Sequence, residues 1–165
     1  MAPIEVVSNA GPLIYLAITG YLDLLSQFYD RIILPQAVYQ EVVVRGAGQP
    51  GADETRAAVA SRRYEVVTVS NHIAVEALLD DLHAGEAEVI VCARELGIRR
   101  VLLDDKAARR KARAMGLEAT GTIGILLLAR EAGFPVAFKQ SLDLLVRNGF
   151  RLSSTVYDTL IATYR

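Results

Sequence analysis

The chain has 165 residues, 52% of them hydrophobic and 22% charged, which is enough for one domain with one substantial core; we expect that domain to span residues 1–165. A formal net charge of −1 argues against a protein that covers nucleic acid with its whole surface, but it leaves room for a local basic patch. The single cysteine, Cys92, excludes a disulfide framework and a cysteine-based zinc site.

The apolar content also bears on where the chain works. Its mean hydropathy of +0.28 is higher than that of most soluble domains, which suggests that part of the apolar surplus forms a subunit interface. The longest apolar run, Ile123 to Ala129, is too short to span a bilayer, so no membrane association is expected. The first residues, MAPIEVV, lack the pattern of a signal peptide. We therefore expect a reduced, cytoplasmic location.

The predicted elements follow the order of an α/β fold. The β-branched run Ile4–Val7 ends at Ser8-Asn9, Gly11 can make the turn, and Pro12 suits a first helical position. Further strands are predicted at 31–34, 64–69, 100–103 and 117–119. Helices are predicted at 12–17, 21–29, 35–44, 53–61, 73–79, 82–97, 106–113 and 123–132, with two C-terminal helices within about 138–165 packing on the domain.

Helical phase singles out Glu86. On a 3.6-residue period it shares a stripe with Val89 and Ile90, whereas Glu88 lies on the side of Cys92, so Glu86 is the acid that points inward. An acid on an apolar face is costly unless something pairs with it, and a cation is the usual partner of several gathered carboxylates. Alternatively Glu86 caps its own helix in the first turn, and taken alone the pattern favours the cap.

Glu41 is a second acid in an apolar setting. It falls between Val38 and Val42 in the helix that starts at Pro35, which would place it on a largely apolar surface. The segment QEVVV has no clean polar face, so a frayed helix end with Glu41 in solvent is equally compatible with the pattern. Both interpretations stay open.

An acidic pair lies where the fourth predicted strand ends. Asp104 ends the strand and Asp105 starts the next helix, at the edge of a parallel sheet where ligands collect. We expect these two aspartates to converge with Glu41 and Glu86. A site made only of carboxylate oxygens suits Mg²⁺ or Mn²⁺, which activate a water and neutralise a phosphodiester during hydrolysis.

The helix after this pair is strongly basic. Its position beside an acidic site favours phosphate binding over a merely solvated face, and the cations proposed to contact nucleic acid are Lys106, Arg109, Arg110 and Arg113. Thr120 and Thr122 can cap the apolar helix that follows, and free N–H groups at that helix start could hold a phosphate. No Walker lysine follows the glycines there, so the segment is not a P-loop.

Five strings, taken in this order, resemble the PIN-domain ribonuclease superfamily, and more closely its prokaryotic branch of PIN-like nucleic-acid-binding proteins, which are relatives of VapC-type toxins. The strings are VVSNAGPLIYLA, LPQAVYQEV, GEAEVIVCARELG, VLLDDKAARRKAR and TGTIGILLLA. The resemblance implies a three-layer α/β/α sandwich with a central, mostly parallel sheet of four or five strands. It also implies metal-dependent RNA cleavage, a small antitoxin partner and a homodimer.

The resemblance carries over to particular residues. In PIN nucleases an acid follows the first strand, a glutamate lies in the helix after the second, an acid opens the central helix, and another follows the fourth strand. These places are occupied by Asn9, Glu41, Glu86 and Asp105, with Asp104 adjacent, and Thr120 or Thr122 falls where the family often has a small polar residue.

Asn9 departs from the pattern and divides the functional hypotheses. An amide oxygen can still coordinate a metal, but the missing negative charge should weaken divalent-ion binding. One hypothesis is therefore an Mg²⁺- or Mn²⁺-dependent endoribonuclease, the toxin of a toxin–antitoxin pair, and the other is a catalytically weakened module that binds nucleic acid or protein. A phosphotransfer receiver or haloacid-dehalogenase-like enzyme is disfavoured, because the first strand ends in an amide and the acidic pair comes late.

Overall fold

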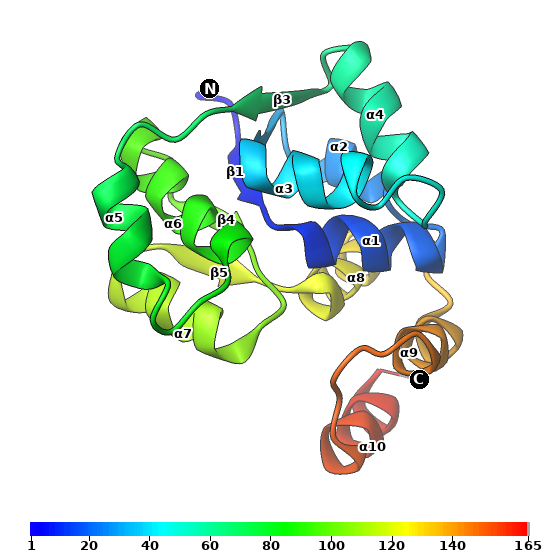
Figure 1. Ribbon diagram of the computed structural model, residues 1–165. Helices are drawn as coiled ribbons and strands as arrows, with labels where there is room; N and C mark the ends of the chain where they lie inside the picture. Colours follow the sequence, from blue (N-terminus) through cyan, green and yellow to red (C-terminus); the bar gives the residue numbers. More distant parts are fainter. Residues whose placement is uncertain (165) are drawn as a thin grey trace.

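A five-stranded parallel sheet forms the centre of the molecule, in a computed structural model that describes residues 1–164 (Figure 1). The strands are β1 (Glu5–Ser8), β2 (Arg31–Pro35), β3 (Tyr64–Val67), β4 (Arg100–Leu102) and β5 (Glu118–Thr120), in the order β3-β2-β1-β4-β5. The chain builds outward from β1 to β3 and then returns to pair β4 with the other side of β1. This reversal puts the switch point of the strand order between β1 and β4, and open α/β sheets bind ligands at the carboxyl ends of the strands at such a point, here called the β1–β4 crevice.

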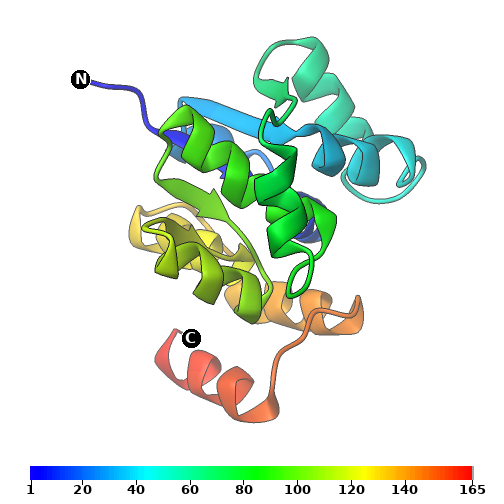
Figure 2. The same ribbon diagram turned by 60° about the vertical axis from the view of Figure 1, so that its left-hand side comes forward.

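Helices cover both faces of the sheet, which confirms the predicted α/β/α sandwich. Helix α6 packs across β1, β2 and β4 with α7 beside it, whereas α1, α2 and α8 pack together on the opposite face (Figures 1 and 2). The helices are α1 (Ala10–Thr19), α2 (Leu24–Phe28), α3 (Gln36–Tyr39), a π-helix η1 (Gln40–Val44), α4 (Ala52–Ala60), α5 (His72–Leu78), α6 (Ala84–Leu96), α7 (Lys106–Ala114), α8 (Thr122–Glu131), α9 (Phe138–Arg147) and α10 (Ser154–Thr163).

The central strands are buried because both faces of the sheet are covered. Val6 and Val7 of β1, Ile33 of β2, and Val101 and Leu102 of β4 are all fully buried. Their sequences are accordingly continuous hydrophobic runs, as parallel strands between two helical layers require. Strand β4 ends at Leu102, so the segment that carries the acidic pair leaves the sheet at its carboxyl edge.

Helix α6 is covered on more than one side. Glu86 is buried, as its helical phase predicts, but Cys92 on the Glu88 side is fully buried as well. Glu88 accepts a hydrogen bond from the Ala37 N–H (3.2 Å), and Glu95 accepts bonds from the backbone after β3. The helical phase alone missed this, because α3 and the β3–α5 connection cover a side of α6 that carries charged residues.

The segment around Glu41 is a π-helix. The Arg45 N–H bonds to the Gln40 carbonyl, five residues back, and the extra residue turns Val42 and Val43 inward while leaving Glu41 exposed. Of the two interpretations that the sequence left open, the exposed one is correct. Such π-helical turns occur frequently at functional sites.

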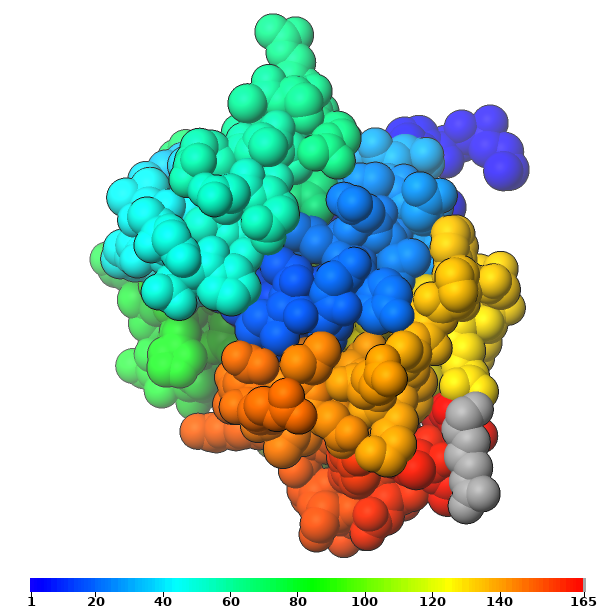
Figure 3. All heavy atoms as spheres, turned by 90° about the vertical axis from the view of Figure 1, so that its right-hand side faces the viewer, coloured from blue at the N-terminus to red at the C-terminus, as the bar shows by residue number. Residues whose placement is uncertain are grey.

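The C-terminal helices form a separate layer at one end of the molecule. Figure 3 shows α9 lying below α1 and α8, with α10 beyond it. Helix α10 contains no buried residue, and the Tyr164 ring that follows it makes an edge contact with Phe138. None of the helices formed by residues 1–164 is long and apolar enough to cross a membrane.

Candidate active site

Asn9 stands at the end of β1, next to the end of β4. Its N–H donates to the Leu102 carbonyl (3.0 Å), which holds the two strand ends together just before the acidic pair. Its side chain does not cap α1, and its Oδ1 atom is buried without a hydrogen-bond partner among residues 1–164. That oxygen faces the start of α6, because it lies 2.9 Å from where a Cβ on Gly85 would be. A buried acceptor without a donor is unusual and needs an explanation.

Glu86 is both inward-facing and a helix cap, so the two interpretations of its position are compatible. Its Oε1 accepts from the His83 N–H at 2.9 Å, whereas Oε2 has no hydrogen bond or ion pair within residues 1–164. Burial raises the pKa of the Glu86 carboxyl above its usual range, and the charges of Asp105 and Glu41 raise it further, against the lowering effect of His83. Asp105 and Glu41 therefore lie close enough to act on Glu86 electrostatically.

Asp105 has one oxygen in use and one available. Its Oδ2 caps α7 by accepting from the Ala108 N–H at 2.9 Å. The residue is exposed, and within the described chain its Oδ1 has neither a hydrogen bond nor an ion pair. Because Asp105 also raises the pKa of Glu86, the two carboxylates lie within electrostatic range of each other, and each has one oxygen without a partner in the described chain.

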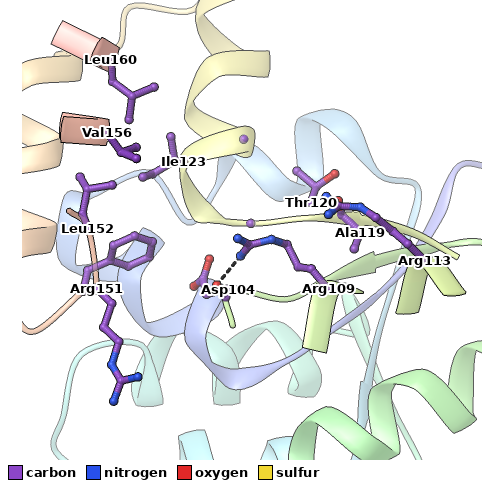
Figure 4. Close-up of a pocket in the computed structure, with 13 residues that line it drawn as sticks. Asp104, Arg109, Arg113, Ala119, Thr120, Ile123, Arg151, Leu152, Val156 and Leu160 are labelled. Atoms are coloured by element: carbon purple, nitrogen blue, oxygen red, sulfur yellow. Dashed lines mark hydrogen bonds between the residues drawn. The ribbon is translucent and has the colours of Figure 1, made fainter. Parts of the chain in front are cut away.

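Asp104 is directed elsewhere. Its Oδ1 accepts from the Thr122 N–H (2.6 Å) and its Oδ2 from the Thr122 hydroxyl (2.8 Å), so both oxygens are occupied at the start of α8. Arg109 donates to the Asp104 carbonyl (Figure 4). Burial raises the pKa of the Asp104 carboxyl, although the Thr122 hydrogen bonds and the Arg109 charge act in the opposite direction. The N–H of Thr122, expected to be free for a phosphate, is therefore taken.

The structure thus brings together three of the five predicted site residues. Asn9 lies against the start of α6 next to Glu86, Asp105 lies within electrostatic range of Glu86, Glu41 acts on Glu86 from the exposed π-helix, and Asp104 faces α8. Within residues 1–164, no three His, Cys, Asp or Glu side chains stand as a group able to hold a metal ion. Two carboxylates and one amide remain, and these hard oxygen donors fit Mg²⁺ or Mn²⁺ in kind. The unpartnered Asn9 oxygen fits a cation as well, since a cation would give it a partner.

The basic helix α7 divides its charges between two sides. Arg109 donates to the Leu103 and Asp104 carbonyls and Arg113 to the Ala119 carbonyl, so both lie along the β4–β5 edge. Arg110 lies on another side, with Lys111 and Asp81. Lys106 is exposed in the first turn and Thr120 is half-buried at the end of β5. The predicted nucleic-acid contacts therefore do not form one continuous stripe.

The contribution of the C-terminal segment to this edge was not predicted from the sequence. Arg151 and Leu152, which follow α9, line a cavity together with Arg109 and Arg113. The available signal was the string FRL directly after the Asn148-Gly149 helix stop, in which an arginine stands between two apolar residues. Nothing in that string indicates that it returns to the carboxyl edge of the sheet.

Comparison with known proteins identifies the family and supports a nuclease-like module. A family model described as PIN domain matches residues 5–165, so the chain belongs to the PIN domain family. One similar solved structure is a PilT N-terminus domain protein from the hyperthermophilic archaeon Sulfolobus solfataricus P2, with 17% sequence identity and a TM-score of 0.49 over 77% of this chain and 94% of that chain. No protein with a curated description matches significantly.

Proposed function

We propose that the protein is an endoribonuclease of PIN type that depends on Mg²⁺ or Mn²⁺. The observation that supports the proposal is that Glu86, Asp105 and Asn9, near the carboxyl ends of β1 and β4, each have an oxygen without a partner within residues 1–164. Family membership makes a nuclease the natural use of such a site. Asp104 then serves as a support that fixes the loop carrying Asp105.

The residues around the crevice would have distinct tasks. Glu86 and Asp105 would hold the ion through their available oxygens and Asn9 through its amide oxygen, while Glu41 adds negative charge at the exposed rim. Such an ion supplies an activated water and neutralises charge on the phosphodiester. Glu86 must be deprotonated to act as a ligand, so its raised pKa means that activity increases as the pH rises through that pKa.

A test of the nuclease is cleavage of a labelled single-stranded RNA by the full chain in the presence of Mn²⁺ or Mg²⁺. Glu86→Gln and Asp105→Asn each keep the backbone cap that the carboxylate provides, so both should fold, and each should lower cleavage by at least about 100-fold. Asp80→Asn, an exposed acid outside the crevice, is the matched control. Wild-type protein that cuts no RNA with either ion, or variants that cut like wild type, would refute the proposal.

A second candidate is a binding module, which Asn9 favours. The amide removes one negative charge from the crevice, and the described residues include no group of three acids suited to a metal. In that case the protein would hold RNA or a partner protein without cutting. Asn9→Asp separates the candidates: a gain in metal affinity and cleavage indicates an attenuated nuclease, and no gain favours the binding module.

We also propose the biological setting that the family resemblance implies. The protein would be a cytoplasmic toxin, one domain over residues 1–165, paired with a small antitoxin and forming a homodimer. Exposed apolar side chains such as Ile73, Leu79 and Leu128 offer contact area for such partners. Induced expression in a bacterial host should arrest growth, the Glu86→Gln variant should not, and growth equal in both would contradict the toxin role.

A further inference from the structure

A cavity lies between the basic helix α7 and the C-terminal segment, beside the crevice that holds Glu86 and Asp105. Its volume is about 400 Å³, within the size range of small-molecule sites. Figure 4 shows its two unlike walls: Arg109 and Arg113 on the α7 side, and Leu152, Val156 and Leu160 on the other, with Ile123 at the start of α8 beside them. Cations therefore face an apolar wall across an open space.

The arginines of this cavity have hydrogen-bond donors without an acceptor in the described chain. Arg109 uses its Nη1 on the Leu103 and Asp104 carbonyls and Arg113 uses its Nη2 on the Ala119 carbonyl, which leaves the other guanidinium nitrogens of each without an acceptor within residues 1–164. Arg151, at the rim, makes neither a hydrogen bond nor an ion pair with the described residues. A guanidinium carries five N–H donors in a fork that matches phosphate oxygens.

The residues that line the cavity leave it with an excess of positive charge. Three arginines line it, and the one acidic lining residue is Asp104, whose two oxygens already accept from Thr122. None of the three arginines forms an ion pair with a described residue. An anion is therefore the missing partner, and arginines together with an apolar surface suit a ligand that has a phosphate at one end and a flat apolar ring at the other.

We propose that this cavity binds the phosphate and base of a single nucleotide. The phosphate lies on Arg109 and Arg113, the base packs against Ile123, Leu152 and Val156, and Arg151, whose guanidinium is directed away from Arg109 in Figure 4, swings in from the rim to complete the site. The nucleotide has two possible sources, the 5′-phosphorylated end of an RNA strand or a free mononucleotide. Only the RNA source rests on the proposed nuclease function.

The direct test is calorimetric titration of the full chain, in buffer with EDTA, with 5′-AMP, adenosine and inorganic phosphate. We expect 5′-AMP to bind at least about tenfold more tightly than either of the other two ligands. Adenosine lacks the phosphate that would contact the arginines, and inorganic phosphate lacks the base that would pack against the apolar wall. Phosphate that binds as tightly as 5′-AMP would show that the apolar wall contributes nothing, which overturns the proposal. So would the absence of 5′-AMP binding at millimolar concentration, or a preference for an acidic peptide over the nucleotide.

Two variants locate the site. Arg113→Ala and Arg151→Ala each remove an exposed side chain, so both should fold, and each should weaken 5′-AMP binding about tenfold. Arg147→Ala is the matched control, since Arg147 is an exposed arginine at the end of α9 outside this cavity. If both variants bind 5′-AMP like wild type, or Arg147→Ala weakens binding as much as they do, the nucleotide does not bind here and the proposal fails.

Two further measurements distinguish the two sources of the nucleotide and test this proposal separately from the nuclease. An RNA hexamer with a 5′-phosphate that binds more tightly than its 5′-hydroxyl counterpart, with the gain lost in Arg151→Ala, assigns the site to the strand end. Tight 5′-AMP binding without that gain assigns it to a free nucleotide. Glu86→Gln should leave 5′-AMP binding unchanged, so a protein that binds the nucleotide but never cuts RNA refutes the nuclease alone.

Discussion

Two adjacent aspartates at the end of β4 have opposite surroundings. Asp104 turns toward α8, where Thr122 occupies both of its oxygens. Asp105 caps α7 with one oxygen, and its other oxygen has no partner in the described chain. Successive side chains of an extended segment point to opposite sides, so one acidic pair supplies two regions. The Asp104 side therefore holds the edge together, while the Asp105 side is where a ligand can bind.

The largest expected effect is a difference in the free energy of unfolding between variants of the two aspartates. Asp104→Ala leaves the buried N–H and hydroxyl of Thr122 without partners and should lower the free energy of unfolding by about 3 kcal/mol. Asp105→Ala removes only a helix cap and should cost about 1 kcal/mol. Urea denaturation of the two variants measures the difference.

A double-mutant cycle assigns the larger loss to one contact. When Thr122→Val is already present, Asp104→Ala should cost much less than it does in the wild type, because the Oγ1 partner is gone and only the N–H remains unpaired. Equal losses for the two aspartates, or additive effects of Asp104→Ala and Thr122→Val, would show that the Asp104 side has no special structural role.

The next largest effect concerns Asn9, whose amide carries no charge. Asn9→Asp adds a carboxylate beside Glu86 and should raise Mn²⁺ affinity about tenfold or more, because ligand charge sets the affinity of oxygen sites. Without metal the same variant should be less stable, since the new charge is repelled by a carboxylate that burial already disfavours. Calorimetric Mn²⁺ titration measures the gain, with the exposed Asn148→Asp as control. Unchanged affinity would mean that the Asn9 side chain does not reach an ion.

A smaller effect follows from the burial of Glu86. Its pKa is raised in the fold, so the folded state favours the protonated form, and stability falls as the pH rises from the unfolded value of 4.5 through the folded pKa. Glu86→Gln keeps an acceptor for the His83 N–H without the charge and should be more stable than wild type by about 1 kcal/mol at pH 7.

The pH dependence of the stability difference between Glu86→Gln and wild type provides the control. As the pH falls below 4.5 the wild-type carboxyl becomes mostly protonated in both states, so most of the advantage of Glu86→Gln should be lost there. Urea unfolding at pH 7 and pH 4 compares the two proteins, and Glu76→Gln, on the exposed side of α5, should change neither value. An advantage that persists at pH 4 would mean that the charge of Glu86 is not its cause.

The contrast between the two aspartates also marks what a sequence can predict. The approach of Asp105 to Glu86 could be expected from the sequence, because chemistry in a parallel α/β sheet collects at the carboxyl ends of the strands, whereas Asn9 was placed in the site only by the resemblance to PIN nucleases. Which aspartate faces which side depends on Thr122, 18 residues further along, so no local pattern indicates it. The same holds for the exposure of Glu41, which one additional residue in a π-helical turn decides.

The smallest expected effect tests how closely Asn9 approaches α6. A Cβ added at Gly85 would lie 2.9 Å from the Asn9 Oδ1, which is too close for either atom to stay in place. Glycine to alanine in a helix ordinarily stabilises by about 1 kcal/mol, so Gly85→Ala should change stability by less than about 0.5 kcal/mol once that contact opposes the gain. In an Asn9→Ala background, where the oxygen is absent, Gly85→Ala should give the full gain. Urea denaturation of the four proteins measures the coupling, and equal gains in both backgrounds would mean that the unpartnered oxygen of Asn9 is not held against the start of α6.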